Sequence, residues 1–174
     1  MNKDNFLEIA KIISNNDEDV MNRVSECVTD PLKYFEDYNE SFDNRGMDED
    51  DETDEIIWIG ILDILIENGY IIEEDWKEGL YTFIDDVNSF KAMQDAGIEV
   101  DEALDSFDED DVNSCIATWA GALDNDSVMQ DYVVGGYDIC SDCYDFFVCT
   151  KEELDTLSKL AEEVGHRICR CSEC

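Results

Sequence analysis

The chain has 174 residues, of which 44% are hydrophobic and 10% are aromatic. A chain of this length buries roughly 70% of its surface on folding, so we expect a single domain spanning residues 1–174 with its own core. Lys and Arg total 11 against 47 Asp and Glu, which gives a formal net charge of -36. A field of this sign repels phosphates and anionic lipid headgroups, so direct binding to nucleic acid or to a membrane surface is disfavoured.

The sequence lacks the patterns of export and membrane insertion. Its start, MNKDNFLEIAKII, has Asp4 and Glu8 where an export signal needs an apolar run. The longest apolar stretch, 56–66, is interrupted by Asp63 and is shorter than the roughly 20 residues that span a bilayer. We therefore expect this stretch to be a buried helix and the protein to be cytoplasmic. In that compartment the eight cysteines are expected to be reduced thiols or metal ligands.

Helical periodicity dominates the N-terminal half of the chain. Apolar residues three and four positions apart predict amphipathic helices over 6–13 and 20–28, and Asp17 is placed to cap the second. Asp30 followed by Pro31 is typical of an N-cap with a proline in the first helical turn. This pair predicts a third, short helix.

An acidic segment interrupts this helical pattern. Residues 40–55 hold nine acids and one base, with almost nothing to bury. We therefore expect an acidic surface loop around 40–54, mobile over 43–53. After the loop, Thr53 is predicted to cap the buried helix and Gly69 to end it.

Beyond the buried helix, a short strand and two further helices are expected. A strand is predicted over 70–72, and helical spacing follows over 80–90. The second helix is predicted over 112–123. Residues 108–111 are placed at its start, where the helix dipole favours acids.

Period-2 alternation appears in the C-terminal part of the chain. Strands are predicted over 132–134, 137–140, 144–149 and 166–169. Gly135 and Gly136 are interpreted as punctuation between the first two strands, and Thr150 with Glu153 predicts a capping box for the helix before the last. The short connections suit antiparallel pairing. The predicted fold class is therefore α+β, with a helical N-terminal half packed on a small, mainly antiparallel sheet from the C-terminal half.

The C-terminal part also carries a family resemblance. The segment SDCYDFFVCTKEELDTLSKLAEEVGHRI resembles an uncharacterised bacterial family defined only as a domain of unknown function. The resemblance covers about a third of the chain and implies no site residue.

Cysteine spacing offers one candidate metal site. Two short-spaced pairs match a structural all-thiolate zinc site, with the ligands Cys140, Cys143, Cys171 and Cys174. The Ser-Asp between the first two cysteines equally fits an ordinary turn between strands. A redox role for this C-x-x-C is disfavoured, because the neighbouring aspartates raise the pKa of a thiol. Cys27 and Cys115 fall on apolar helical faces, where a cysteine is usually a small core residue.

The sequence contains no recognisable catalytic motif, and no catalytic residue is assigned. His166 is the only histidine, so a Ser-His-Asp or Cys-His arrangement has one possible base, which is placed in a predicted edge strand. Carboxylates are too abundant to indicate acid–base chemistry. The acidic segments 48–55 and 105–111 lack the order of an EF-hand, so only loose calcium binding is expected.

The most distinctive feature is the stretch of 59 residues over 92–150 that contains no Lys or Arg. The negative electrostatic field of such a stretch favours rapid association with a basic protein surface. The leading hypothesis is an acidic cytoplasmic protein-interaction domain, such as an inhibitor or immunity-like partner of a basic protein. The predicted partner-binding residues are Asp105, Asp108, Glu109, Asp110 and Asp111. Two alternatives remain open: a metal-stabilised domain that holds zinc with the four cysteines, and an enzyme with an unrecognised carboxylate site.

Overall fold

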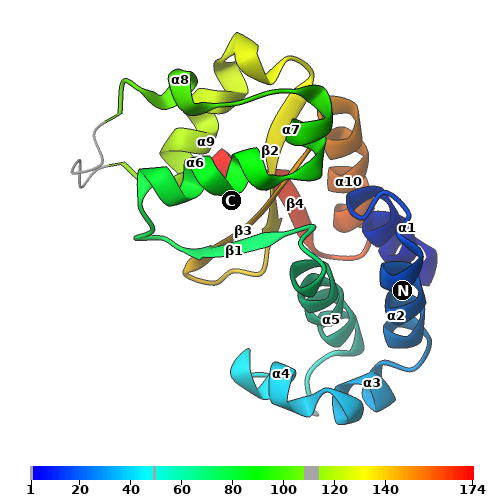
Figure 1. Cartoon of the computed structure of the whole chain (residues 1–174). Coiled ribbons are helices and arrows are strands. Elements are labelled where there is room, and N and C mark those ends of the chain that lie inside the picture. Colours follow the sequence, from blue (N-terminus) through cyan, green and yellow to red (C-terminus); the bar gives the residue numbers. More distant parts are fainter. Residues whose placement is uncertain (1, 49, 108–113) are drawn as a thin grey trace. The chain divides into compact units, whose positions relative to one another are not determined.

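Two compact units make up the chain. The computed structural model describes residues 2–48, 50–107 and 114–174. The first unit comprises Met1–Tyr70 and Lys159–His166, and the second comprises Ile71–Ser158 and Arg167–Cys174. Figure 1 shows both units, coloured along the sequence. No helix in the described ranges is long and apolar enough to cross a bilayer.

The first unit is helical, as the sequence predicts. Its helices are α1 (Lys3–Ile13), α2 (Glu18–Thr29), α3 (Pro31–Asp37), α4 (Asn39–Asn44) and α5 (Thr53–Glu67). The two predicted caps are confirmed. Asp17 accepts hydrogen bonds from the backbone N–H groups of Asp19 and Val20 at 3.0 and 3.1 Å, and Asp30 accepts one from Lys33 at 3.4 Å. These bonds satisfy donors that a helix start leaves unpaired.

The helix α5 is the centre of the first unit. It is buried almost all round and packs against α1, α2 and α3. Its Trp58 ring stacks on His166 at 4.4 Å between centroids, and the Phe6 ring lies 6.4 Å from Trp58. His166 therefore belongs to the aromatic core of this unit rather than to an edge strand. Thr53 is the first residue of α5 and not its cap, which is Glu52.

The acidic segment is anchored more firmly than the sequence predicts. Part of the expected loop forms α4, and Phe42 in this helix is only 1% exposed. Phe42 stacks on Phe35 at 4.8 Å, while Arg45 binds Asp63 of α5 at 2.8 Å. One aromatic side chain and one ion pair thus anchor the first part of a segment whose composition is otherwise polar.

Gly60 lies where α5 comes close to α2. A Cβ atom added there would lie 2.8 Å from Cys27 Sγ, which is less than real Cβ contacts allow. Glycine at this position therefore lets α5 approach α2.

We predict that Gly60→Ala destabilises the first unit through this clash. Overpacking costs about 1–3 kcal/mol, which the higher helix propensity of alanine offsets by about 1 kcal/mol. Adding Cys27→Ala removes the clashing sulfur, so the double variant should lose less stability than the two single variants summed. Chemical denaturation of the four proteins measures this coupling, and additive effects would contradict the predicted contact.

The second unit contains a four-stranded antiparallel sheet. Its strands are β1 (Ile72–Asp75), β2 (Tyr132–Asp138), β3 (Cys143–Thr150) and β4 (Arg167–Arg170). The order across the sheet is β1-β3-β2-β4, and each neighbouring pair is antiparallel. The predicted α+β class is therefore confirmed.

The strand β2 runs without interruption through the two glycines that the sequence analysis takes as punctuation. A Cβ atom at Gly135 would lie 2.7 Å from the ring of Phe147, and one at Gly136 would lie 2.6 Å from Cys174 Sγ. Both positions require glycine because other side chains lie directly against the backbone. The glycines therefore mark close approaches inside one strand.

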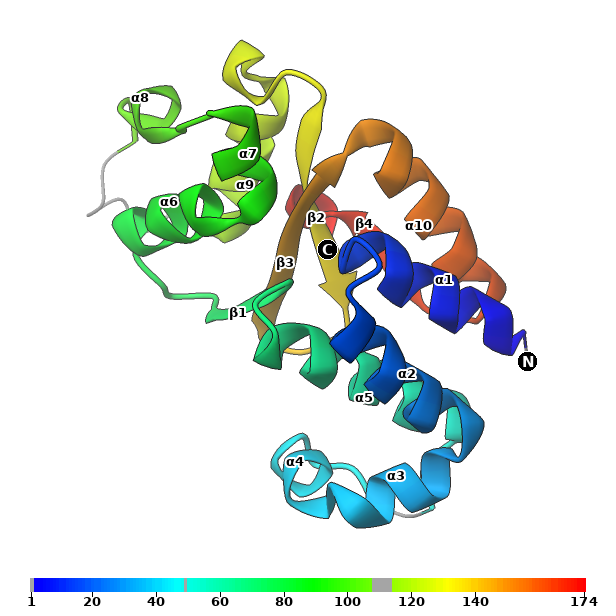
Figure 2. The ribbon, with the colours of Figure 1, turned by 45° about the vertical axis from the view of Figure 1, so that its right-hand side comes forward.

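Helices cover one face of this sheet. They are α6 (Leu80–Ser89), α7 (Lys91–Ala96), α8 (Asp101–Leu104) and α9 (Ile116–Asn125), and Figure 2 shows α6, α7 and α9 grouped beside β3. The ring of Phe83 on α6 lies 5.5 Å from Phe146 of β3 and 5.8 Å from Trp119 of α9. These contacts form the core of the second unit. The short 3-10 helices η1 (Ser127–Met129) and η2 (Cys171–Glu173) complete it.

The two remaining sequence predictions for helix starts have different outcomes. The capping box that opens α10 (Lys151–Glu163) is confirmed, because Thr150 N–H donates to Glu153 at 2.8 Å and Glu153 N–H donates to Thr150 Oγ1 at 3.2 Å. The helix α9 begins at Ile116 instead of 112, with Cys115 as its N-cap. Its predicted acidic start, 108–111, lies outside the described residues.

Three carboxyl groups meet where β1 faces α6. Glu74 lies within hydrogen-bonding reach of Asp86 and Glu78, and burial together with these neighbours raises the pKa of Glu74 to about 7. Burial also raises the pKa of Asp86. A hydrogen bond between two carboxyl groups requires a proton on one of them, so the folded unit retains a proton that an unfolded chain releases.

We predict that this retained proton makes the second unit lose stability as the pH rises. The folded pKa of Glu74 lies above its unfolded value, so its contribution is fully present below about pH 4.5 and is lost as the pH rises through about 7. In Glu74→Gln, the free energy of unfolding should vary less over this window. Glu102→Gln removes an exposed carboxylate of the same unit and serves as the control. An unchanged pH dependence in Glu74→Gln would refute the shared proton.

Candidate functional site

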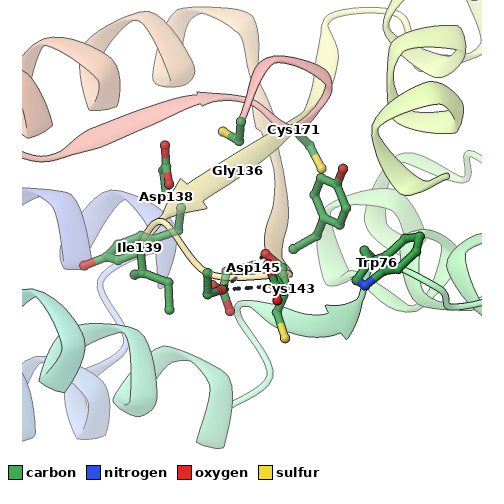
Figure 3. Close-up of a pocket in the computed structure, with 12 residues that line it drawn as sticks. Trp76, Gly136, Asp138, Ile139, Cys143, Asp145 and Cys171 are labelled. Atoms are coloured by element: carbon green, nitrogen blue, oxygen red, sulfur yellow. Dashed lines mark hydrogen bonds between the residues drawn. The ribbon is translucent and has the colours of Figure 1, made fainter. Parts of the chain in front are cut away.

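A pocket of about 410 Å³ lies where β2 and β3 meet in a hairpin. Its described lining comes entirely from the second unit and consists of Trp76, Gly136, Tyr137, Asp138, Ile139, Ser141, Asp142, Cys143, Tyr144, Asp145, Cys171 and Cys174. In Figure 3, Trp76 and Asp138 stand on opposite sides, with Asp145 and Cys143 between them. The pocket thus combines aromatic, acidic and sulfur-containing side chains.

Short polar side chains fix the hairpin turn that forms one wall. The backbone of Cys140 has a φ of 57°, and its N–H donates to Asp138 Oδ1 at 2.8 Å. The N–H of Cys143 donates to Ser141 Oγ at 3.1 Å. Such Asx-type and Ser-type turns replace ladder hydrogen bonds where a strand reverses. The C-x-x-C sequence is therefore an ordinary turn between strands, as one of the two sequence interpretations expects.

The pocket lining carries negative charge. Three of the residues are aspartates, and none of the described lining residues is Lys or Arg. Asp138 pairs with Arg167 at 3.2 Å, whereas Asp142 is exposed and Asp145 is 4% exposed. A carboxylate is costly to bury unless cations or donors stabilise it. The described lining of the pocket is therefore rich in carboxyl groups.

One aromatic wall is open to solvent. Trp76 is 51% exposed, whereas Trp58 and Trp119 are 0% and 3% exposed. The ammonium group of Lys77 lies 4.7 Å from the centroid of the Trp76 ring. This contact shows that the ring already accepts a cation on one face, the geometry of a cation–π interaction.

The predicted zinc ligands are not gathered into one metal site. Cys143, Cys171 and Cys174 all line the pocket, but Cys174 forms a disulfide with Cys169, so its sulfur is not available as a thiolate. Cys140 is exposed on the turn. In the described ranges, no group of three or more His, Cys, Asp or Glu side chains is arranged to hold a metal ion. The disulfide also departs from the expectation that every cysteine is a reduced thiol or a metal ligand.

The free thiols differ in the pKa values that their surroundings impose. Burial, followed by the nearby Glu73, Asp145 and Asp75, raises the pKa of Cys143. Burial raises the pKa of Cys171 to about 12. The acidic neighbours thus raise the pKa of the Cys143 thiol, which is the effect predicted from the sequence and which disfavours a redox role for the C-x-x-C.

Cys115 is the exception among these thiols. Its sulfur lies 3.6 Å from Thr118 Oγ1 at the N-terminus of α9. Although burial opposes the change, hydrogen bonds from Thr118, Ala117 and Tyr144 lower the pKa of Cys115. The spacing of apolar residues predicts Cys115 on an apolar helical face, and that prediction is wrong because α9 starts at Ile116, one residue after Cys115. Cys27, predicted as a core residue, is buried as expected.

Of the five predicted partner-binding acids, only Asp105 lies within the described residues. Asp105 is exposed beside α8, and Asp108, Glu109, Asp110 and Asp111 lie outside the described residues. The run before them exposes further carboxylates, at Asp95, Glu99, Asp101 and Glu102. The described segment 95–105 therefore offers five exposed acids.

We predict that Cys115 is alkylated at lower pH than Cys143, because the thiolate is the reactive form. Mass spectrometry of iodoacetamide-treated protein over a pH series gives the midpoint for each thiol. Thr118→Val removes one donor and should move the Cys115 midpoint upward, while Thr118→Ser keeps the hydroxyl and should leave it unchanged. Equal midpoints for Cys115 and Cys143 would contradict the assigned hydrogen bonds.

Comparison with known proteins adds a family assignment. The family model described as "Domain of unknown function (DUF6630)" matches residues 5–172. The similarity therefore covers nearly the whole chain and is not limited to the C-terminal third, where the sequence analysis places it. Neither the curated proteins nor the solved structures gave a match. The chain belongs to the DUF6630 family, a domain of unknown function.

Proposed function

We propose that this chain is an acidic, cytoplasmic protein-interaction domain that binds a basic protein, as an inhibitor or immunity-like partner does. The observation that carries the proposal is the acidic segment 95–105 of the second unit, which we call the acidic face. Five exposed carboxylates fall within 95–105, inside a stretch of 59 residues that has no Lys or Arg. None of these five carboxylates takes part in an ion pair of the described residues, so solvent, ions or a partner must neutralise them.

The negative charge of this face increases the rate of association more than it strengthens individual contacts. Exposed ion pairs contribute little to affinity one by one, because water and salt screen them. A field of one sign nevertheless raises the rate at which an oppositely charged protein arrives and orients. A basic nuclease or another nucleic-acid-binding protein has the matching charge, because its own site must attract phosphate. An acidic domain of this kind can occupy such a site.

A charge-matched pair of variants tests the proposal. The face variant carries Asp95→Asn, Glu99→Gln, Glu102→Gln and Asp105→Asn. The control variant carries Asp19→Asn, Glu26→Gln, Glu36→Gln and Asp43→Asn, which are exposed acids of the first unit. Each set removes four negative charges from a net charge of -36, so total charge cannot explain a difference between the two. Asp101 is left unchanged because it accepts a hydrogen bond from Asn88 at 3.0 Å.

The measurement is the association rate with a basic protein that native lysate supplies. Proteins captured at about 0.05 M salt and released at about 0.5 M are identified, purified and mixed with each variant in a stopped-flow instrument. We predict that the face variant associates on the order of 10-fold more slowly and that the control variant stays near the wild-type rate. Equal slowing of both variants, or an association rate that does not change with salt, would contradict the proposal. The acids would then serve only to keep the protein solvated.

A further inference from the structure

We infer that Cys115 and Cys171 are a redox-active thiol pair, which a low-molecular-weight disulfide oxidises to a Cys115–Cys171 disulfide. The two thiols come from segments that are distant in sequence, the N-terminus of α9 and the 3-10 helix η2. Both segments belong to the second unit. The inference goes beyond the proposed binding of a basic protein and does not depend on it.

Cys115 has the surroundings of a nucleophilic thiol. It is the N-cap of α9, and its sulfur lies 3.6 Å from Thr118 Oγ1. Burial opposes ionisation of this thiol, but hydrogen bonds from Tyr144 and from two residues of the first helical turn outweigh it and lower the pKa of Cys115. The side chain is only half-buried, so a small molecule can reach it. Because the thiolate is the attacking form, Cys115 is the thiol that reacts first.

Tyr144 of β3 joins Cys171 to the same cluster. Its phenol is hydrogen-bonded to Cys115 and also interacts electrostatically with Cys171. The two thiols interact with each other as well. Their segments pack together, and a Cβ atom added at Gly121 of α9 would lie 3.2 Å from Ser172 Cβ of η2. Two thiols and one phenol are therefore gathered where α9 meets η2.

The burial of Cys171 sets the order of the two reaction steps. Its side chain is 1% exposed, so an external disulfide cannot reach it directly. Burial, followed by the charges of nearby groups, raises the pKa of Cys171 to about 12. A thiol that is mostly protonated attacks slowly, so the second step is slower than the first. Cys171 therefore acts on a disulfide that has already formed beside it, at Cys115.

The reaction balances with one external disulfide, R–S–S–R. The Cys115 thiolate attacks one of its sulfur atoms, forms Cys115–S–S–R and expels R–S⁻. Cys171 gives its proton to this R–S⁻, and the resulting thiolate attacks Cys115 Sγ and expels the second R–S⁻. The two protein thiols are thereby oxidised to a disulfide, and R–S–S–R is reduced to one R–SH and one R–S⁻.

The other free thiols do not share these surroundings. Burial raises the pKa of both Cys27 and Cys149, and both side chains are buried. Burial and then nearby acidic groups raise the pKa of Cys143. Cys140 is exposed on the β2–β3 turn, so it serves as a control for accessibility alone.

A neighbouring disulfide provides a competing reaction. Cys169 and Cys174, which lie on either side of Cys171 in the sequence, are joined to each other. A thiolate can attack this internal disulfide as well as an external one. The experiment must therefore identify which sulfur atoms become joined.

A neutral probe, bis(2-hydroxyethyl) disulfide, tests the pair in the full chain. The reaction is quenched with acid at successive times, the protein is digested with pepsin, and mass spectrometry identifies adducts and linked peptides. The adduct should appear first on Cys115 and then decay while a Cys115–Cys171 linked peptide accumulates, with the Cys169–Cys174 disulfide unchanged. A Cys115 adduct that persists, a link from Cys115 to Cys169 or Cys174, or faster modification of Cys140 would overturn the inference.

Three variants assign the steps. Cys171→Ala should keep the adduct on Cys115 without decay, and Cys115→Ser should abolish both the adduct at this position and the link. Cys140→Ser removes an exposed thiol outside the cluster and should leave both steps unchanged. Decay of the adduct at the wild-type rate in Cys171→Ala would overturn the role of Cys171. The wild-type time course decides the matter by itself if a variant fails to fold.

A phenol variant tests the cluster around the two thiols. Tyr144→Phe keeps the ring and removes the donor to Cys115, so the first step should slow about two- to fivefold, because the thiolate fraction falls more than its nucleophilicity rises. The rate is measured below the alkylation midpoint of Cys115, where the thiolate fraction limits it. Tyr132→Phe removes a hydroxyl from β2 and is the matched control, with an unchanged rate expected. Equal rates in Tyr144→Phe and wild type would overturn the cluster on which the pair rests.

Discussion

The placement of carboxylates is the constraint on which the rest of the structure depends. With 47 acids and 11 Lys and Arg, the chain can neutralise only a minority of its charges internally. Some of the basic residues join segments that are distant in sequence. Arg45 binds Asp63 at 2.8 Å within the first unit, and Arg170 binds Asp124 at 2.8 Å between β4 and α9. Since leaving either buried partner unpaired is strongly destabilising, these few bases are committed to the fold.

Backbone donors stabilise other acids of the chain. Backbone N–H groups at helix starts and turns carry partial positive charge and lack a partner in the helix itself. Asp17 and Glu153 use such groups at α2 and α10, and Asp126 accepts from Val128 N–H at 2.8 Å at η1. Such donors therefore contribute to the stability of a strongly acidic chain. The exposed acids of 95–105 take part in none of the ion pairs of the described residues.

Local sequence signals predicted the elements well, and contacts between distant residues decided the details that they missed. Spacing of apolar residues and the caps at Asp17 and Thr150 identified helices because both depend on neighbours within one turn. Gly135 is typical of a break between strands, yet it lies inside β2, where the Phe147 ring of β3 packs directly against its backbone. No local pattern reveals this contact. The Cys169–Cys174 disulfide and the helix start at Cys115 depend equally on tertiary placement. In the pocket, Asp145 gave one usable signal, a carboxylate inside an apolar strand.

The pocket lies at the end of the sheet, between two turns that are each held by an aspartate side chain. After β1, Asp75 accepts the N–H of Lys77 at 2.9 Å, and this turn carries Trp76 outward. After β2, Asp138 accepts the N–H of Cys140 at 2.8 Å and holds the turn that bears Asp142. Both walls are therefore fixed by hydrogen bonds within a few residues of chain. A pocket whose walls are already fixed loses less conformational freedom when a ligand enters, so more of the attraction between ligand and pocket remains as binding free energy.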